Sequence, residues 1–108
     1  MKKEVIRIHE LLLKADKRKR IEYRILEETL HEVLVDDMIE ELTTHDENKK
    51  DSVDLYYPTT WFDRSLLTWA ARKAARIVDF CYFYEYIEKY DDVFSVVYFG
   101  RENGHKSD

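Results

Sequence analysis

Glycine, proline and cysteine are all scarce in this sequence: 108 residues include two glycines, one proline and one cysteine. All-β folds need many turns, and turns draw on glycine and proline, so an all-β architecture is disfavoured. Both glycines, Gly100 and Gly104, lie near the C-terminal end, where they cannot form a glycine-rich phosphate loop. Cys81 has no second cysteine for an intrachain disulfide, and its aromatic neighbours predict a buried, apolar thiol.

Long apolar runs and recognisable catalytic motifs are also missing. No run of 18 apolar residues and no secretory leader is visible, which predicts an intracellular protein that does not span a membrane. None of the serines lies in a glycine-flanked elbow. His9-Glu10 and His31-Glu32 each lack the second histidine of a zinc-binding HExxH motif, and we expect both histidines on exposed helix faces. The sequence therefore predicts a non-enzymatic protein without catalytic residues, cofactor or metal.

One weak metal pattern is present. Asp37, Glu41 and His45 recur at every fourth position, which would align three ligands along a helix. Carboxylates are so frequent in this segment that such spacing arises readily, and no zinc-type Cys/His spacing accompanies it. We therefore expect no metal site.

The composition is that of a single soluble domain with a heavily charged surface. Hydrophobic residues make up 44% and charged residues 38% of the chain. A chain of this length supports one modest core. We expect one domain over residues 1–100 and a polar, flexible tail over residues 101–108.

The N-terminal half predicts short helices followed by a hairpin. Apolar spacing predicts helices over residues 3–15 and 21–34, with Ile25 among the inward side chains of the second. The apolar face then shifts, which predicts a break near Leu34–Asp36 and a third short helix to Thr43. Alternation of apolar and polar residues between Leu42 and Tyr57 predicts a β-hairpin.

The C-terminal half predicts a long helix from Pro58 to about Tyr90, rich in aromatic residues. Ala70, Ala71, Ala74 and Ala75 would allow another element to approach closely. Because aromatic residues favour strands, Phe80–Glu88 could instead be a strand paired with Val93–Phe99. With the helix preferred, the fold class is mainly α (α+β): three short helices, a β-hairpin and a long C-terminal helix.

The charges are strongly segregated along the chain. Residues 1–24 contain nine Lys/Arg against four Asp/Glu, whereas residues 25–54 contain two against eleven. We expect an acidic face that binds a basic protein partner. The predicted face consists of Glu28, Glu32, Asp36, Asp37, Glu40 and Glu41.

Aromatic residues gather near the C-terminal end, where nine of fifteen lie between Phe80 and Phe99. One small domain has difficulty covering so many rings, and tyrosine is common at interfaces. A homodimer interface and a plain core explain the block about equally well. The predicted interface consists of Trp69, Phe80, Tyr82, Phe83, Tyr84 and Tyr86.

The element order over residues 3–90 resembles small dimeric winged-helix proteins of the PadR or MarR kind. In that family the third helix enters the major groove of DNA. Here the corresponding predicted helix bears four carboxylates between Asp36 and Glu41, which would repel phosphates. DNA contact would then fall to basic residues elsewhere: Lys14, Lys17, Arg18, Lys19, Arg20, Arg24, Lys49 and Lys50.

These patterns leave two functional hypotheses. The first is a small acidic inhibitor or regulator, of the kind a phage or virus uses in the cytoplasm of its host, which occupies the basic surface of a nucleic-acid-binding protein. The alternative is a winged-helix transcription regulator that binds DNA through its basic N-terminal segment.

Overall fold

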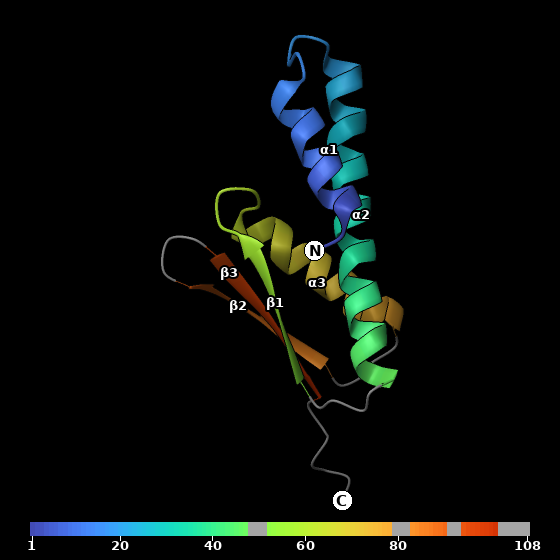
Figure 1. Cartoon of the computed structure of the whole chain (residues 1–108), viewed down its shortest axis with the longest axis vertical. Coiled ribbons are helices and arrows are strands. Elements are labelled where there is room, and N and C mark those ends of the chain that lie inside the picture. Colours follow the sequence, from blue (N-terminus) through green and yellow to red (C-terminus); the bar gives the residue numbers. More distant parts are fainter. Residues whose placement is uncertain (48–51, 79–82, 91–93, 102–108) are drawn as a thin grey trace, which may run out of the picture.

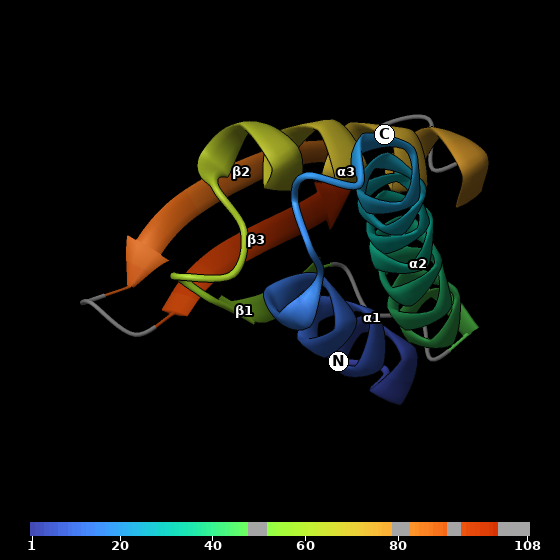
Figure 2. The ribbon, with the colours of Figure 1, turned by 90° about the horizontal axis from the view of Figure 1, so that it is seen from above.

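A computed structural model of the protein describes residues 1–47, 52–78, 83–90 and 94–101. The elements follow the order α1 (Lys3–Lys14), α2 (Arg20–Glu47), β1 (Ser52–Pro58), α3 (Arg64–Val78), β2 (Phe83–Tyr90) and β3 (Phe94–Arg101). The three strands form an antiparallel sheet in the order β1-β3-β2. Helices α2 and α3 pack side by side on one face of this sheet, and α1 packs along α2 (Figures 1 and 2). The class is therefore α+β and mainly helical.

The α1–α2 pair projects beyond the sheet and gives the molecule an elongated shape, with extents of 56 × 29 × 21 Å (Figure 1). The predicted N-terminal helix is confirmed, and Val5 and Ile8 of α1 are buried against the core. Further along the projection the apolar side chains lose cover. Ile25 is 56% exposed, so its predicted inward position is wrong.

Helix α2 runs unbroken for 28 residues, or about 42 Å. The predicted break near Leu34–Asp36 and the separate third helix are therefore wrong. The apolar face shifts because α2 packs against α1 along one side and α3 along another. Leu34, Val35 and Met38 are all buried, and the segment contains no glycine or proline to interrupt it.

The predicted hairpin between Leu42 and Tyr57 is also wrong, because the helix continues to Glu47. Its second half is nevertheless a strand with the predicted alternation, in which Val53, Leu55 and Tyr57 face the core. The partner of β1 is the distant β3, with Leu55 opposite Val97. β1 forms one edge of the sheet. Pro58 has no N–H to donate, and at an edge strand this does not remove a hydrogen bond from the interior of the sheet.

The long C-terminal helix is the third correction. Helix α3 ends at Val78, and Phe83–Tyr90 forms strand β2, which pairs with β3 as the strand alternative predicts. Ring-bearing residues favour a pleated backbone, and the adjacent β3 provides the ladder that fixes it. The predicted role of the alanines holds: all four are buried where α3 meets its neighbours.

The core lies between the helices and the inner face of the sheet. Among the described residues its largest fully buried side chains include Tyr57, Phe99, Leu34 and Met38. None of the described helices combines the length and apolar character needed to cross a lipid bilayer.

Candidate functional site

The outward side of α3 carries a cationic surface, which we call the α3 face. Its members recur every third or fourth position, in two adjacent rows on one side of the helix. They line a shallow concavity of about 610 Å³: Arg64, Ser65, Thr68, Trp69, Arg72, Lys73 and Arg76. No Asp or Glu lies between Arg64 and Val78, so the face has four cations and no carboxylate of its own helix.

The opposite side of α3 explains this orientation. Leu67 and the four alanines are buried, so the longer polar side chains must point to solvent. Asp63 precedes the helix and caps it, because its Oδ1 accepts a hydrogen bond of 2.8 Å from the Leu66 N–H. Trp69 is 44% exposed within the face, and the Lys73 Nζ lies 5.1 Å from its ring centroid.

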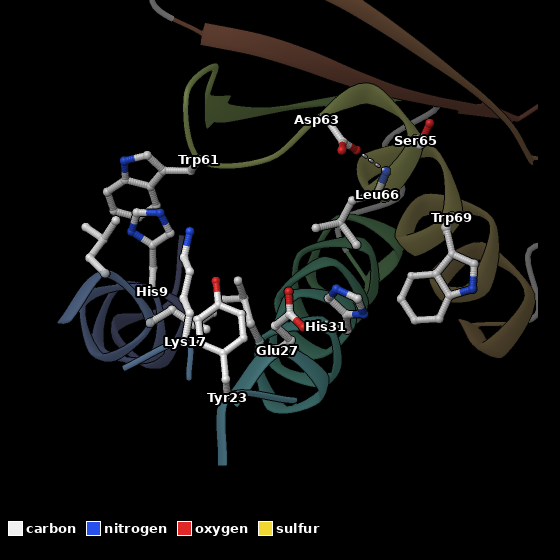
Figure 3. A pocket seen from close by; sticks show the side chains of 13 residues that line it. His9, Lys17, Tyr23, Glu27, His31, Trp61, Asp63, Ser65, Leu66 and Trp69 are labelled. Carbon is white, nitrogen blue, oxygen red and sulfur yellow. Dashed lines mark hydrogen bonds between the residues drawn. The ribbon is translucent and has the colours of Figure 1, made fainter. Parts of the chain in front are cut away.

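A groove of about 750 Å³ lies beside the α3 face, between α1, α2 and the start of α3 (Figure 3). Five ring-bearing side chains line it: His9, Tyr23, His31, Trp61 and Trp69. Trp61 and His9 stand on one side of the groove and Trp69 and His31 on the other (Figure 3). Ser65 and Trp69 line both the groove and the α3 face.

His9 forms the base of the α1 wall. Its ring stacks on Trp61 with centroids 4.0 Å apart and an interplanar angle of 9°. The expected exposed position of His9 is wrong, because Trp61 folds over it and leaves 8% of the residue exposed. Burial lowers the pKa of the imidazole, although the nearby Glu10 opposes the shift. Its Nδ1 is buried and has no hydrogen-bond partner among the described residues.

The charged groups of the groove are one cation and two carboxylates. Lys17 extends over Tyr23, with its Nζ 6.0 Å from the ring centroid. Glu27 supplies a carboxylate on α2, and the Asp63 carboxylate is already engaged as the α3 cap. The groove therefore combines aromatic walls with a formal charge of −1 from these three residues.

The structure separates the predicted acidic face into exposed and internal groups. Glu28, Glu32, Asp36 and Glu40 are exposed at successive fourth positions of α2; we call them the acidic stripe. Glu40 forms an ion pair of 2.9 Å with the Lys2 side chain, and this pairing is the main cause that raises the pKa of Lys2. Glu41 is half-buried. The outward acidic surface is thus narrower than the sequence predicts.

Asp37 does not belong to that surface. It is 2% exposed, and its carboxylate accepts hydrogen bonds from the Lys2 backbone N–H at 2.6 Å and the Tyr57 hydroxyl at 2.7 Å. Burial and the Asp37 carboxylate raise the pKa of Tyr57, so the phenol stays protonated and donates. The prediction of an outward Asp37 is wrong because α1 and β1 both approach this side of α2.

The basic N-terminal residues surround the turn between α1 and α2, at the far end of the helical projection (Figure 1). Lys14, Lys17, Arg18, Lys19, Arg20 and Arg24 are all exposed. Arg18 pairs with Asp16, and no ion pair joins this segment to the acidic stripe within the described part of the chain. Lys49 and Lys50 lie outside the described residues.

The predicted dimer interface is placed only in part. Trp69 is exposed, on α3. The backbones of Phe83, Tyr84 and Tyr86 lie in the edge strand β2, and their side chains are outside the description. Phe80 and Tyr82 lie outside the described residues.

No group of three or more His, Cys, Asp or Glu side chains is arranged to hold a metal ion in the described part of the chain. Of the three residues in the weak metal pattern, Asp37 is occupied by Lys2 and Tyr57, and the side chain of His45 is outside the description.

Comparison with known proteins gives no relative: no family model, no curated protein and no solved structure matches the chain. The α3 face, the groove and the acidic stripe are therefore the features of the molecule that indicate its function.

The sequence contained a signal for the α3 face that the predictions did not use. Arg64, Arg72 and Arg76 are separated by multiples of four, which places them on one helix face. A predicted helix that continued to Tyr90 added Asp79, Glu85 and Glu88 to the same element and concealed its charge. The groove had no comparable signal, because its residues come from three helices and from the segments that connect α1 to α2 and β1 to α3.

Proposed function

We propose that the protein binds duplex nucleic acid and that the α3 face contacts its phosphates. The observation that carries this proposal is the set of four cations on one side of α3, without a carboxylate from that helix. Positive side chains that neutralise phosphates and release counterions provide most non-specific affinity for DNA. The hydroxyls of Ser65 and Thr68 add further hydrogen-bond donors of the kind that contact phosphates.

The element order of the structure differs from the one expected from the sequence, and it suits the same proposal. The carboxylates that argued against DNA contact belong to α2, and the third helix of the chain is the cationic α3. A hairpin of β2 and β3 follows α3, as a wing follows the DNA-contacting helix in winged-helix proteins. The distance from Arg64 to Arg76 along α3 is about 18 Å, which is long enough to reach several phosphates.

Fluorescence anisotropy with a labelled blunt duplex at several salt concentrations tests this function. If all four cations contact phosphates, the logarithm of affinity falls against the logarithm of salt with a slope of about −3 to −4. The variant Arg64→Gln/Arg76→Gln should lower the affinity and reduce the slope by about 2.

Lys14→Gln/Lys19→Gln is the matched control, because it removes the same charge from the basic N-terminal segment. If this control loses binding and the α3 variant does not, the N-terminal segment is the contact surface, as the sequence-based alternative holds. Absence of salt-sensitive binding in the unmodified protein would refute a nucleic-acid function altogether.

The acidic stripe supports a second candidate function, the binding of a basic protein partner. Glu28, Glu32 and Asp36 are exposed like charges at every fourth position, and each such pair destabilises the helix by about 0.2–0.5 kcal/mol. None of the three forms an ion pair within the described residues. A viral inhibitor of a nucleic-acid-binding protein would use such a surface.

Charge reversal tests this second function. Glu32→Lys/Asp36→Lys should abolish salt-sensitive capture of a basic protein from host lysate, whereas Glu22→Lys/Asp54→Lys, at exposed sites outside the stripe, should preserve it. Equal capture by both variants would exclude the stripe as the contact surface.

Homodimerisation stays a prediction. The aromatic residues of the edge strand β2 are the support for it, because Trp69 lies in the surface proposed to bind nucleic acid. Sizing by light scattering at tens of micromolar protein should give twice the chain mass, and a monomer would count against the interface.

A further inference from the structure

The groove beside the α3 face has the chemistry of a site for a flat heteroaromatic ring. We infer that it binds an unpaired base of the nucleic acid whose phosphates lie along α3. This inference rests on the proposed nucleic-acid function and specifies the ligand: a duplex with a bulged or overhanging base.

The walls of the groove provide surfaces for stacking. The His9–Trp61 stack stands on one side, and Trp69 stands on the other, with its centroid 5.6 Å from that of His31 (Figure 3). Proteins hold unpaired bases on such rings, and stacking on one aromatic side chain changes affinity by about 5- to 150-fold. The volume of the groove, about 750 Å³, is within the usual range for small-ligand sites.

The charges of the groove come from one cation and two carboxylates. Lys17 and Glu27 carry opposite charges, and Asp63 is engaged by the Leu66 N–H. A base is uncharged and has donors and acceptors along its edge, which suit Lys17 and Glu27.

The wall of the groove also contains a buried polar atom without a hydrogen-bond partner. His9 lines the groove, and its buried Nδ1 has no hydrogen-bond partner among the described residues. Buried polar atoms of folded proteins are nearly always hydrogen-bonded, so such an atom requires an explanation. This nitrogen is enclosed beneath Trp61, so a base would reach it only if the Trp61 ring shifts on binding.

The groove is continuous with the α3 face, which indicates that its ligand is a base within a longer nucleic-acid strand. Ser65 and Trp69 line both surfaces, so the groove opens beside the first turns of α3. Phosphates that follow Arg64 and Arg72 would bring a base that has left the duplex to the mouth of the groove. A free aromatic metabolite would not need the adjacent row of cations.

The test compares a blunt DNA duplex with the same duplex bearing one bulged adenine, by anisotropy at fixed salt. The bulged duplex should bind at least 5-fold more tightly to the unmodified protein. Tyr23 lies between the two walls of the groove (Figure 3), so in Tyr23→Ala the base loses a contact and the ratio of the two affinities should fall towards 1. Tyr56→Ala, an exposed tyrosine on β1 outside the groove, should retain the ratio of the unmodified protein.

A second measurement does not depend on Tyr23. Titration with the mononucleotide dAMP should quench tryptophan emission, because Trp61 and Trp69 line the groove. Equal affinity for both duplexes, or equal ratios in the two tyrosine variants, would overturn the inference while leaving duplex binding intact. Failure to bind either duplex would instead refute the proposed function. Quenching by a trimethyllysine peptide and not by dAMP would also overturn the inference, in favour of a cation-binding groove.

Discussion

Asp37 connects three elements that are far apart in the sequence. Its carboxylate accepts the Lys2 backbone N–H before α1 and the Tyr57 hydroxyl on β1, while the residue itself belongs to α2. A buried carboxylate is costly unless its oxygens are hydrogen-bonded, and here each oxygen has one donor. Asp37 therefore fixes the start of α1 and the end of β1 against the same turn of α2.

Removal of one of these two donors tests how much the Asp37 junction contributes to stability. Tyr57→Phe should lower the free energy of unfolding by about 1.5–3 kcal/mol, because the lost hydrogen bond is to a buried charged group. Urea denaturation followed by circular dichroism checks the value. Tyr23→Phe is the control and should change stability by less than about 0.5 kcal/mol, since its hydroxyl has no partner among the described residues. Equal losses in both variants would mean that Tyr57 contributes no special bond.

His9 gives the protein a pH dependence with a defined sign. Burial lowers the pKa of the folded imidazole below its ordinary value of 6.5, so the unfolded chain binds a proton more readily than the folded chain. The contribution of His9 to stability is complete above pH 6.5 and is lost as the pH falls below it.

Urea midpoints at pH 7.5 and 5.5 check this dependence. The unmodified protein should have the lower midpoint at pH 5.5, and His9→Phe, which keeps a ring beneath Trp61, should show a smaller difference. A larger difference in the variant would contradict the assignment to His9.

The apolar pattern of the sequence correctly predicted the elements that bury only one face. Helix α1 and the alternation of β1 follow from the sequence because each buries a single regular face. The pattern failed in α2, where two neighbours bury two overlapping faces of one helix and imitate a break. The pattern failed again after Val78. An aromatic segment can form a helix or a strand, and here it forms a strand because β3 supplies the hydrogen-bonding partner.

The small residues of α3 set how closely it packs. Ala74 is fully buried, and we expect Ala74→Leu to lower the free energy of unfolding by about 1–3 kcal/mol through overpacking. Arg76→Leu, on the exposed side of the same helix, should change it by no more than about 0.5 kcal/mol. Urea unfolding of both variants provides the comparison, and a neutral Ala74→Leu would mean that space remains on the buried side of α3.

At the scale of the whole molecule, the acidic stripe and the α3 face carry opposite charges and occupy separate helices. The acidic stripe lies along α2 and the cations lie along α3, which packs beside it. The sequence predicted correctly that the charges are segregated. The predicted acidic face contained too many residues, and the cationic surface of α3 was not predicted. Only the fold could place Asp37 inside and assemble the groove from residues between His9 and Trp69.

This charge arrangement predicts an effect of salt on the proposed DNA binding. Glu28→Gln/Glu32→Gln/Asp36→Asn should raise duplex affinity about 3- to 10-fold at 10 mM salt, where screening extends over about 30 Å, and much less at 200 mM. Anisotropy titrations at both concentrations give the comparison. An equal gain at both concentrations would point to a direct contact between the stripe and DNA, and a loss would contradict the expected repulsion.

The position of β3 in the middle of the sheet has a consequence for synthesis on the ribosome. β1 is translated more than thirty residues before β3, the only described strand with which it pairs. The two long N-terminal helices could associate while translation continues, but β1 must wait with an unsatisfied edge until residue 101 has left the exit tunnel. During that interval the nascent chain would be open to chaperones and to pairing with other chains.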